Sequence, residues 1–147
     1  YRWYETANFC RDDGGPRELR ARHNLGIWRG QDYLGLGIGA VSTLAGVRRR
    51  NLPSLGRYVA ALRAGGPAPC ELEPLAAETR AVEALMLGLR LDEPLPLTDE
   101  LATVVDQGSL ERLVARGLVE RMDAGIRLTP HGRLLGGGVT AELLAVR

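Results

Sequence analysis

Apolar residues recur at intervals of three or four along two segments, and this spacing predicts two amphipathic helices. The first helix runs over about 53–64, with Pro53 suited to its first position. The second runs over 75–90 despite Gly88. Its apolar stripe consists of Ala76, Val82, Leu85, Met86 and Leu89. We expect Met86 to be part of the core.

The residues after the second helix predict helices and a hairpin. These are a helix 99–106 capped by Thr98, a helix 109–116 capped by Ser109, a hairpin 118–122 and 126–128, and a last helix from the cap Thr129 and Pro130 toward residue 146. Helix, helix, hairpin, helix is a winged-helix-like order. The sequence therefore predicts a C-terminal lobe of three to four helices plus a β-hairpin.

Apart from this hairpin, strands are predicted only in the first part of the chain. The run L-G-L-G-I-G-A-V-S at 34–42 alternates with period two, which places Leu34 and Leu36 on one face and glycines on the other. Residues 1–9 are rich in aromatic side chains and predict a strand, and 16–22 predict one helical turn.

The run GGPAP at 65–69 is the best candidate for a boundary between lobes, because Gly and Pro interrupt regular structure. We therefore expect two domains, 1–66 and 67–147. Strands in the first lobe and helices in the second make the fold class α+β.

A glycine-lined strand face is expected where a ligand or another backbone approaches closely. Close packing of a helix on bare backbone explains the same pattern. The run is not GxGxxG and no helix clearly follows it, so it does not fit a dinucleotide-binding fingerprint.

Two clusters of side chains flank this strand. His23, Asn24 and Trp28 offer an imidazole, an amide and a flat ring. Together they could hold a planar ligand by stacking and bind an iron or a polar edge through the imidazole. The triplet Arg48, Arg49 and Arg50 could hold carboxylates or phosphates with planar guanidinium groups. A hydrogen-bonded structural histidine and a solvated strand end are the alternative interpretations.

Composition narrows the class of protein. The 147 residues are 45% hydrophobic, enough for one ordinary core, and no apolar run reaches the eighteen or so residues of a membrane span. Two cysteines sixty positions apart favour a reducing cytosol, so we expect a cytoplasmic protein.

The two halves of the chain differ in charge. Residues 1–70 hold 11 arginines and five acidic residues, a net charge of +6. Residues 71–147 hold eight arginines and 13 acidic residues, a net charge of −5. A basic half suits a ligand with carboxylates, although attraction between two lobes explains the asymmetry equally well.

Several motifs together resemble one family. In chain order they are YETANF at 4–9, HNLGIW at 23–28, YLGLGIGAVS at 33–42, Asn51, ALMLGLRL at 84–91 and LTPHG at 128–132. This set resembles the C-terminal part of the radical-SAM proteins related to oxygen-independent coproporphyrinogen III oxidase. The branch that it resembles most is that of the HemW-type haem chaperones, and the resemblance covers essentially the whole chain.

The resemblance implies a haem or tetrapyrrole ligand, with His23 as a candidate iron ligand, Asn24 and Trp28 beside it, and Arg48 to Arg50 as propionate partners. It places Gly37, Gly39, Ala40 and Val41 near S-adenosylmethionine. Residues 1–66 would then complete a partial radical-SAM barrel, and 67–147 would form the winged-helix-like lobe. The implied partners are the N-terminal barrel of the same protein and haem-receiving proteins.

The chain departs from the family at three points. It has no CxxxCxxC motif, so the [4Fe-4S] cluster and S-adenosylmethionine would belong to an N-terminal part and the chain would not be catalytic alone. Haem chaperones of this family have a motif that resembles HNxxYW, and Ile27 stands at the position of its tyrosine. Val41 stands where relatives often have the histidine of a GAHS motif. A phenol and a second imidazole are thereby absent.

A protein- or DNA-binding winged-helix-like module without catalysis is the alternative function. Its recognition helix would be 109–116, with Arg112 and Arg116 available. Residues 71–147 carry a net charge of −5, which opposes DNA binding, because neutralisation of the DNA phosphates supplies much of a protein's affinity for DNA. We therefore expect no nucleic-acid partner. A hydrolase or transferase is not supported, because the sequence has no nucleophile elbow, P-loop or metal-spaced histidine pair, and His131 is expected to be exposed.

Overall fold

Helices and strands alternate irregularly in the computed structural model, which describes residues 1–15 and 17–144, and the fold class is α+β as predicted. Contacts group the chain into two compact units. Unit 1 combines Tyr1–Gly30 with the chain from Ala77 onward, and unit 2 is Gln31–Ala76. The predicted boundary between residues 66 and 67 differs from this division, because it lies inside unit 2.

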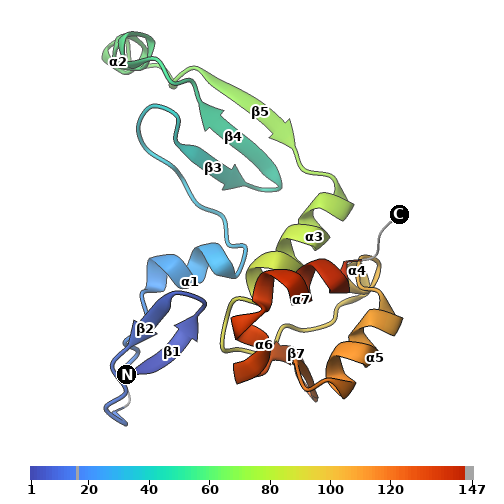
Figure 1. Ribbon diagram of the computed structural model, residues 1–147. Coiled ribbons are helices and arrows are strands. Elements are labelled where there is room, and N and C mark those ends of the chain that lie inside the picture. The colour runs from blue at the N-terminus through green and yellow to red at the C-terminus, as the bar shows by residue number, and fades with distance from the viewer. Residues whose placement is uncertain (16, 145–147) are drawn as a thin grey trace. The chain divides into compact units, whose positions relative to one another are not determined.

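Unit 1 begins with a β-hairpin followed by a short helix (Figure 1). Strands β1 (Arg2–Glu5) and β2 (Asn8–Cys10) are antiparallel. The single strand predicted over 1–9 is therefore wrong. The reason is a turn at residues 6 and 7, where the Glu5 carboxylate accepts hydrogen bonds from the Ala7 N–H and the Asn8 amide.

Helix α1 (Arg22–Trp28) contains the His-Asn pair instead of following a helical turn at 16–22. The prediction of a turn before His23 is therefore wrong for the described residues 17–21, which are not helical.

The rest of unit 1 is mainly helical. Its elements are α3 (Ala77–Gly88), α4 (Asp99–Ala102), α5 (Gln107–Ala115), β6 (Val119–Met122), β7 (Gly125–Leu128), α6 (Pro130–Leu134) and α7 (Gly136–Leu143). These elements contribute the larger hydrophobic core, in which Leu85, Leu110, Leu113 and Leu143 are fully buried. The predicted helix over 75–90, the hairpin, and the caps Thr98 and Thr129 are confirmed.

Four details of this part differ from the prediction. The helix predicted over 99–106 already ends at Ala102. Helix α5 is capped by Asp106, whose carboxylate accepts the N–H of Ser109, so Ser109 is a buried residue inside the helix. Met86 is 49% exposed and does not belong to the core. The last helix breaks at Leu135 into α6 and α7, and residues 145–147, where we expected it to continue, lie outside the described part of the chain.

Unit 2 is a three-stranded antiparallel sheet with one helix. The strands β3 (Val41–Leu44), β4 (Val47–Asn51) and β5 (Cys70–Pro74) lie in this order, and α2 (Leu55–Arg63) connects β4 to β5 (Figure 1). The helix predicted over 53–64 is confirmed. The strand predicted over 34–42 is wrong before Val41, because Gly37 and Gly39 have φ angles of 103° and 67°, which no β-strand allows.

Unit 2 contributes no residue to the two hydrophobic core clusters found among the described residues. Instead it exposes large apolar side chains, namely Leu34, Leu36, Ile38, Leu44, Leu55, Leu62 and Leu72. A small sheet that belongs to neither hydrophobic cluster is expected to be stabilised by a further layer. Within the described residues, no helix is both long and apolar enough to span a membrane.

Candidate functional site

Helix α1 carries the first cluster of predicted site residues. His23 is exposed, whereas Asn24 and Trp28 are half-buried. At about 100° per residue, Asn24 and Trp28 share one face of the helix, and His23 lies about 140° from Trp28. The imidazole and the indole therefore do not form one continuous surface.

The buried face of α1 packs on the smaller core cluster. Leu25 is 3% exposed and lies in this cluster with Tyr4, Cys10 and Leu91, and Trp28 packs against it. The Trp28 indole Nε1 is buried and has no hydrogen-bond partner among the described residues. This anchoring leaves His23 as the accessible polar group of the predicted set on α1.

One face of the Trp28 ring is covered by an arginine. The guanidinium carbon of Arg90 lies 4.4 Å from the ring centroid, a cation–π contact. The Nε of Arg90 donates to Glu5 Oε1 at 2.7 Å, and its Nη2 lies 2.7 Å from the same oxygen. A planar ligand could therefore stack only on the opposite face of Trp28.

Glu5 has no exposed surface, yet it remains the charged partner of this arrangement. Burial raises the pKa of Glu5, but hydrogen bonds from the Asn8 amide, the Ala7 N–H and Arg90 outweigh it and hold the pKa below its ordinary value. The carboxylate is thus ionised at neutral pH, and it fixes the guanidinium over Trp28.

A second carboxylate holds α1 at both ends. Arg20, which precedes the helix, and Arg29, which follows it, both form ion pairs with Glu93. Hydrogen bonds from Arg29 and then Arg20 outweigh burial and lower the pKa of Glu93. The turn at 90–93 therefore supports α1 in two ways, through Leu91 in the smaller core cluster and through the ion pairs of Glu93.

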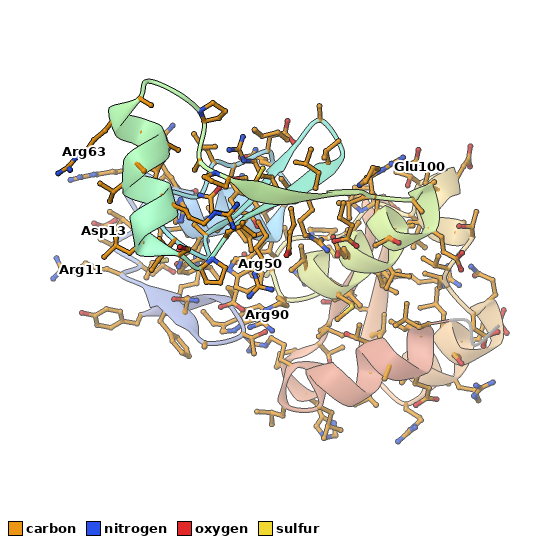
Figure 2. The ribbon with its side chains drawn as sticks, turned by 90° about the horizontal axis from the view of Figure 1, so that it is seen from above. Arg11, Asp13, Arg50, Arg63, Arg90 and Glu100 are labelled. Carbon is orange, nitrogen blue, oxygen red and sulfur yellow. The ribbon has the colours of Figure 1, made fainter. Side chains whose placement is uncertain are left out.

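The predicted propionate partners lie on β4, in unit 2. Arg48 lies 3.4 Å from Glu73, and Arg49 donates to the Ala68 carbonyl at 2.8 Å. Arg50, which is labelled in Figure 2, is exposed. In the register of the sheet it lies opposite Glu71. Because side chains alternate along a strand, Arg48 and Arg50 share one face of the sheet and Arg49 lies on the other.

The glycine-rich segment before β3 is held by side chains of unit 2. The Gly37 N–H donates to the Tyr58 hydroxyl at 3.0 Å, and its carbonyl accepts the Asn51 amide at 2.9 Å. The Gly35 N–H donates to Ser42 Oγ at 3.0 Å. Gly39 and Ala40 complete the connection to Val41, the first residue of β3, and the Ala40 carbonyl accepts the Asn51 N–H at 2.9 Å. The segment is thus fixed through its backbone, while Leu34, Leu36 and Ile38 stay exposed.

The residues present do not fit an iron–sulfur cluster. Such a cluster needs several cysteine ligands, and this chain has two, with Cys10 buried in unit 1 and Cys70 in unit 2. Among the described residues, no three His, Cys, Asp or Glu side chains are grouped so that they could hold a metal ion. A single imidazole such as His23 fits an axial ligand of haem.

Sequence reasoning missed Glu5, Arg90 and Glu93. Glu5 occupies a core position of β1, where the sequence alone does not distinguish it from an ordinary strand residue. The charged run R-L-D-E at 90–93, which directly follows a helix, is the signal that could have indicated Arg90 and Glu93. Its Glu93 has the opposite charge to the arginines on either side of α1 and pairs with both of them.

The arginines of the predicted recognition helix are exposed, and each of them lies near a carboxylate of the same unit. Arg112 Nε lies 3.8 Å from a carboxylate oxygen of Glu142, and Arg116 Nη1 lies 3.7 Å from the other. Both arginines are therefore partly neutralised within unit 1, which further weakens the DNA-binding alternative.

Comparisons with known proteins identify relatives. Residues 75–135 match the family described as the HemN C-terminal domain. The chain is 34% identical over 145 residues, 98% of its length, to the heme chaperone HemW of Mycobacterium tuberculosis, and 25% identical over 96% of its length to HemW of Bacillus subtilis. It spans 35% and 38% of these relatives, about a third of their length.

One solved structure shares the fold. It is that of coproporphyrinogen III oxidase (HemN) from Escherichia coli, a radical SAM enzyme, and it matches with a TM-score of 0.55 and 24% sequence identity. The match covers 76% of this chain and 28% of that one.

Proposed function

The chain resembles the C-terminal part of the HemN and HemW proteins, and from this we propose that it is the C-terminal portion of a radical-SAM haem chaperone or oxygen-independent coproporphyrinogen III oxidase-like protein. Similarity to a heme chaperone over 98% of the chain is the observation that carries the proposal. The portion contributes tetrapyrrole contacts and, through its winged-helix-like lobe, a lid.

The tetrapyrrole contact is assigned to helix α1. His23, which is exposed, provides the ligand for the haem iron or a donor to a propionate. Asn24 orients the ligand by a hydrogen bond, and Trp28 provides a stacking surface on the ring face that Arg90 does not cover. Arg48, Arg49 and Arg50 on β4 are proposed separately as partners for propionate groups.

The proposed partner of unit 2 is the N-terminal barrel of the same protein. The barrel would cover apolar side chains such as Leu36, which is 81% exposed, and would bring S-adenosylmethionine to the side of Gly37, Gly39, Ala40 and Val41. Because the cysteines here do not fit a [4Fe-4S] cluster, the cluster and S-adenosylmethionine are assigned to that barrel. Haem-receiving proteins are the proposed downstream partners.

A haem titration followed by the Soret absorption band tests the role of α1. The comparison is between wild type, His23→Ala and His131→Ala, because His131 is the second of the two histidines and is also exposed, on α6. We expect saturable binding in wild type and His131→Ala, and a changed Soret position with weaker binding in His23→Ala. Equal spectra and affinities for all three proteins would contradict an iron-ligand role for His23.

A second titration tests the arginines. Replacing Arg48, Arg49 and Arg50 by Gln should weaken haem binding without moving the Soret band, since a propionate partner does not touch the iron. The matched control replaces Arg57 and Arg63, on helix α2 of the same unit, by Gln. If both sets of variants bind haem as wild type does, the arginine triplet is not a propionate site.

A further inference from the structure

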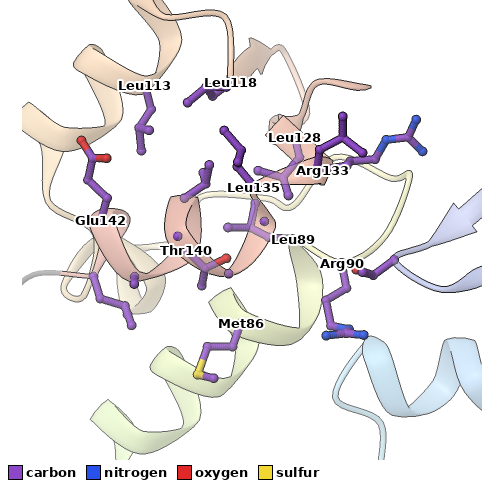
Figure 3. A pocket seen from close by; sticks show the side chains of 18 of the residues that line it. Met86, Leu89, Arg90, Leu113, Leu118, Leu128, Arg133, Leu135, Thr140 and Glu142 are labelled. Carbon is purple, nitrogen blue, oxygen red and sulfur yellow. The ribbon is translucent and has the colours of Figure 1, made fainter. Parts of the chain in front are cut away.

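An open pocket of about 740 Å³ lies in unit 1 between α3, the end of α5 and the pair α6–α7 (Figure 3). Its floor consists of side chains that already belong to the core, including Leu89, Leu113, Leu128 and Val139. The floor is therefore well supported, and a ligand would not have to create it. The proposed haem function does not use this pocket.

Large apolar side chains project from the rim of the pocket. Leu134 is 83% exposed, and Leu135 and Met86 are each 49% exposed. Several apolar residues exposed side by side around a hollow are typical of a protein-interaction site. A small molecule inside the hollow would leave Leu134 in water, so a macromolecular partner explains the whole surface better.

The wall formed by the start of α7 has no side chains. Gly137 and Gly138 both line the pocket, and a Cβ placed on either would meet no atom within 4 Å. The backbone of a partner could therefore approach this wall closely.

The charge of the lining selects the kind of partner. Three arginines, Arg90, Arg116 and Arg133, line the pocket against one carboxylate, Glu142, although residues 71–147 as a whole carry a charge of −5. Arg90 pairs with Glu5 and Arg116 with Glu142. Arg133 lies 3.7 Å above the Trp3 ring and has no carboxylate partner among the described residues. Arg90 and Arg133 lie at one end of the pocket and Glu142 lies at the other (Figure 3).

We propose that this pocket binds an amphipathic α-helix of a partner protein. One face of that helix carries Leu- or Phe-sized side chains, which cover Leu134, Leu135 and Met86. A carboxylate at its flank pairs with Arg133. Recognition of this kind reads apolar residues at positions i, i+3, i+4 and i+7. A second copy of the chain is disfavoured as the occupant, because two copies of the rim would bring like charges together.

Two synthetic helical peptides of about 18 residues serve as probes. Both carry leucines at the spacing above, and they differ only in having Glu or Lys on the flanks. The chain has two methionines, which makes ¹³C-methyl methionine spectra a simple readout. Met86 lies on the rim of the pocket, whereas Met122 is 41% exposed on β6 and does not line it, so its signal is an internal control.

We expect the Glu peptide to shift the Met86 signal saturably, to leave Met122 unmoved, and to bind at least about tenfold more tightly than the Lys peptide. Leu135→Glu should lower the affinity for the Glu peptide about tenfold or more. Leu72→Glu, a matched change at an exposed leucine of β5, should leave this affinity unchanged. Arg133→Glu should reverse the preference between the two peptides. Circular dichroism confirms that each variant is folded.

Three results would overturn the proposal. The first is an unmoved Met86 signal up to about millimolar Glu peptide. The second is equal affinity for both peptides, because the surface would then be merely hydrophobic. The third is a Met86 shift that depends on protein concentration alone, which would identify a second copy as the occupant.

Discussion

Glu5 and Arg90 are joined by a hydrogen bond of 2.7 Å across 85 positions of sequence, and the carboxylate has no exposed surface. Beside this pair, the Asp92 N–H donates to the Tyr4 carbonyl at 3.1 Å, and Glu5 forms a bridge with Leu91. The first hairpin is thereby attached to the turn after α3. This attachment explains why Tyr1–Gly30 belongs to unit 1 and not to the sheet that follows it in sequence.

The first prediction concerns this ion pair. Arg90→Leu leaves the Glu5 carboxylate buried without its cation and exposes one face of Trp28, so we expect the free energy of unfolding of unit 1 to fall by roughly 2–3 kcal/mol. Urea denaturation followed by tryptophan fluorescence measures this. Arg121→Leu, on the exposed side of β6, is the matched control and should change stability by less than about 0.5 kcal/mol. Equal effects of the two substitutions would show that the pair contributes nothing.

The second prediction concerns the loss of stability in acid. The pKa values of Glu5 and Glu93 are below the ordinary 4.5, so the folded state binds these two protons less readily than the unfolded state does. Their contribution to stability is fully present above pH 4.5 and is lost as the pH falls through the lowered values. We expect the free energy of unfolding to be nearly constant from about pH 7 to 5.5 and to fall below about 4.5.

A substitution separates the contribution of Glu93 from the others. Glu93→Gln should be about 1 kcal/mol less stable than wild type at neutral pH, and its stability should fall less steeply in acid. The measurement is a set of urea denaturation curves between about pH 7 and 3. Glu111→Gln, at an exposed position of α5, should follow the wild-type curve. Parallel curves for Glu93→Gln and wild type would contradict this account.

Sequence patterns predict the helices of this chain better than its strands. The reason is that helices depend on residues close in sequence, whereas strands depend on pairing with distant segments. The spacing of apolar residues identifies α2 and α3, and side-chain caps such as Thr129 mark helix starts within a few residues. Strand β5 is not predicted, and β4 is predicted only as the solvated strand end considered for Arg48–Arg50, because a charged run becomes a strand only through pairing with its neighbours. The alternation of Leu and Gly over 34–39 was misleading, because it reflects a backbone held by Tyr58 and Asn51.

The residues of the candidate site can be named from the sequence, but their arrangement cannot. The spacing from His23 to Trp28 suggested a joint surface, whereas the helix that contains them separates the two side chains around its axis. The contacts that fix α1 come from Glu5, Arg90 and Glu93, which are distant in sequence. Only the tertiary structure brings those residues together.

The third prediction compares Gly132, in α6, with Gly137, in α7. A Cβ on Gly132 would lie 1.9 Å from the Leu118 carbonyl oxygen, which cannot move freely because it accepts the Thr129 N–H at 3.1 Å. Gly132→Ala should therefore lower the free energy of unfolding by about 3 kcal/mol or more. Gly137→Ala has open space around the added methyl group and should stabilise α7 by about 0.5 kcal/mol. Thermal denaturation of the two variants measures both changes in stability. If both substitutions shifted the stability in the same direction, the prediction would be wrong.

The last prediction concerns the glycine-rich segment of unit 2. The Tyr58 hydroxyl is the hydrogen-bond acceptor for the Gly37 N–H, so Tyr58→Phe leaves this backbone group without a protein partner and should cost about 1 kcal/mol locally. We expect faster amide hydrogen exchange over 34–39 and little change in the strands β3 to β5, because the hydrogen bonds between these strands do not involve the Tyr58 hydroxyl.

Tyr33→Phe is the matched control, since Tyr33 forms hydrogen bonds with Thr43 through its backbone. Asn51→Ala removes the donor to the Gly37 carbonyl and should add to the effect of Tyr58→Phe. Unchanged exchange at 34–39 in the double variant would show that these two side chains do not hold the segment.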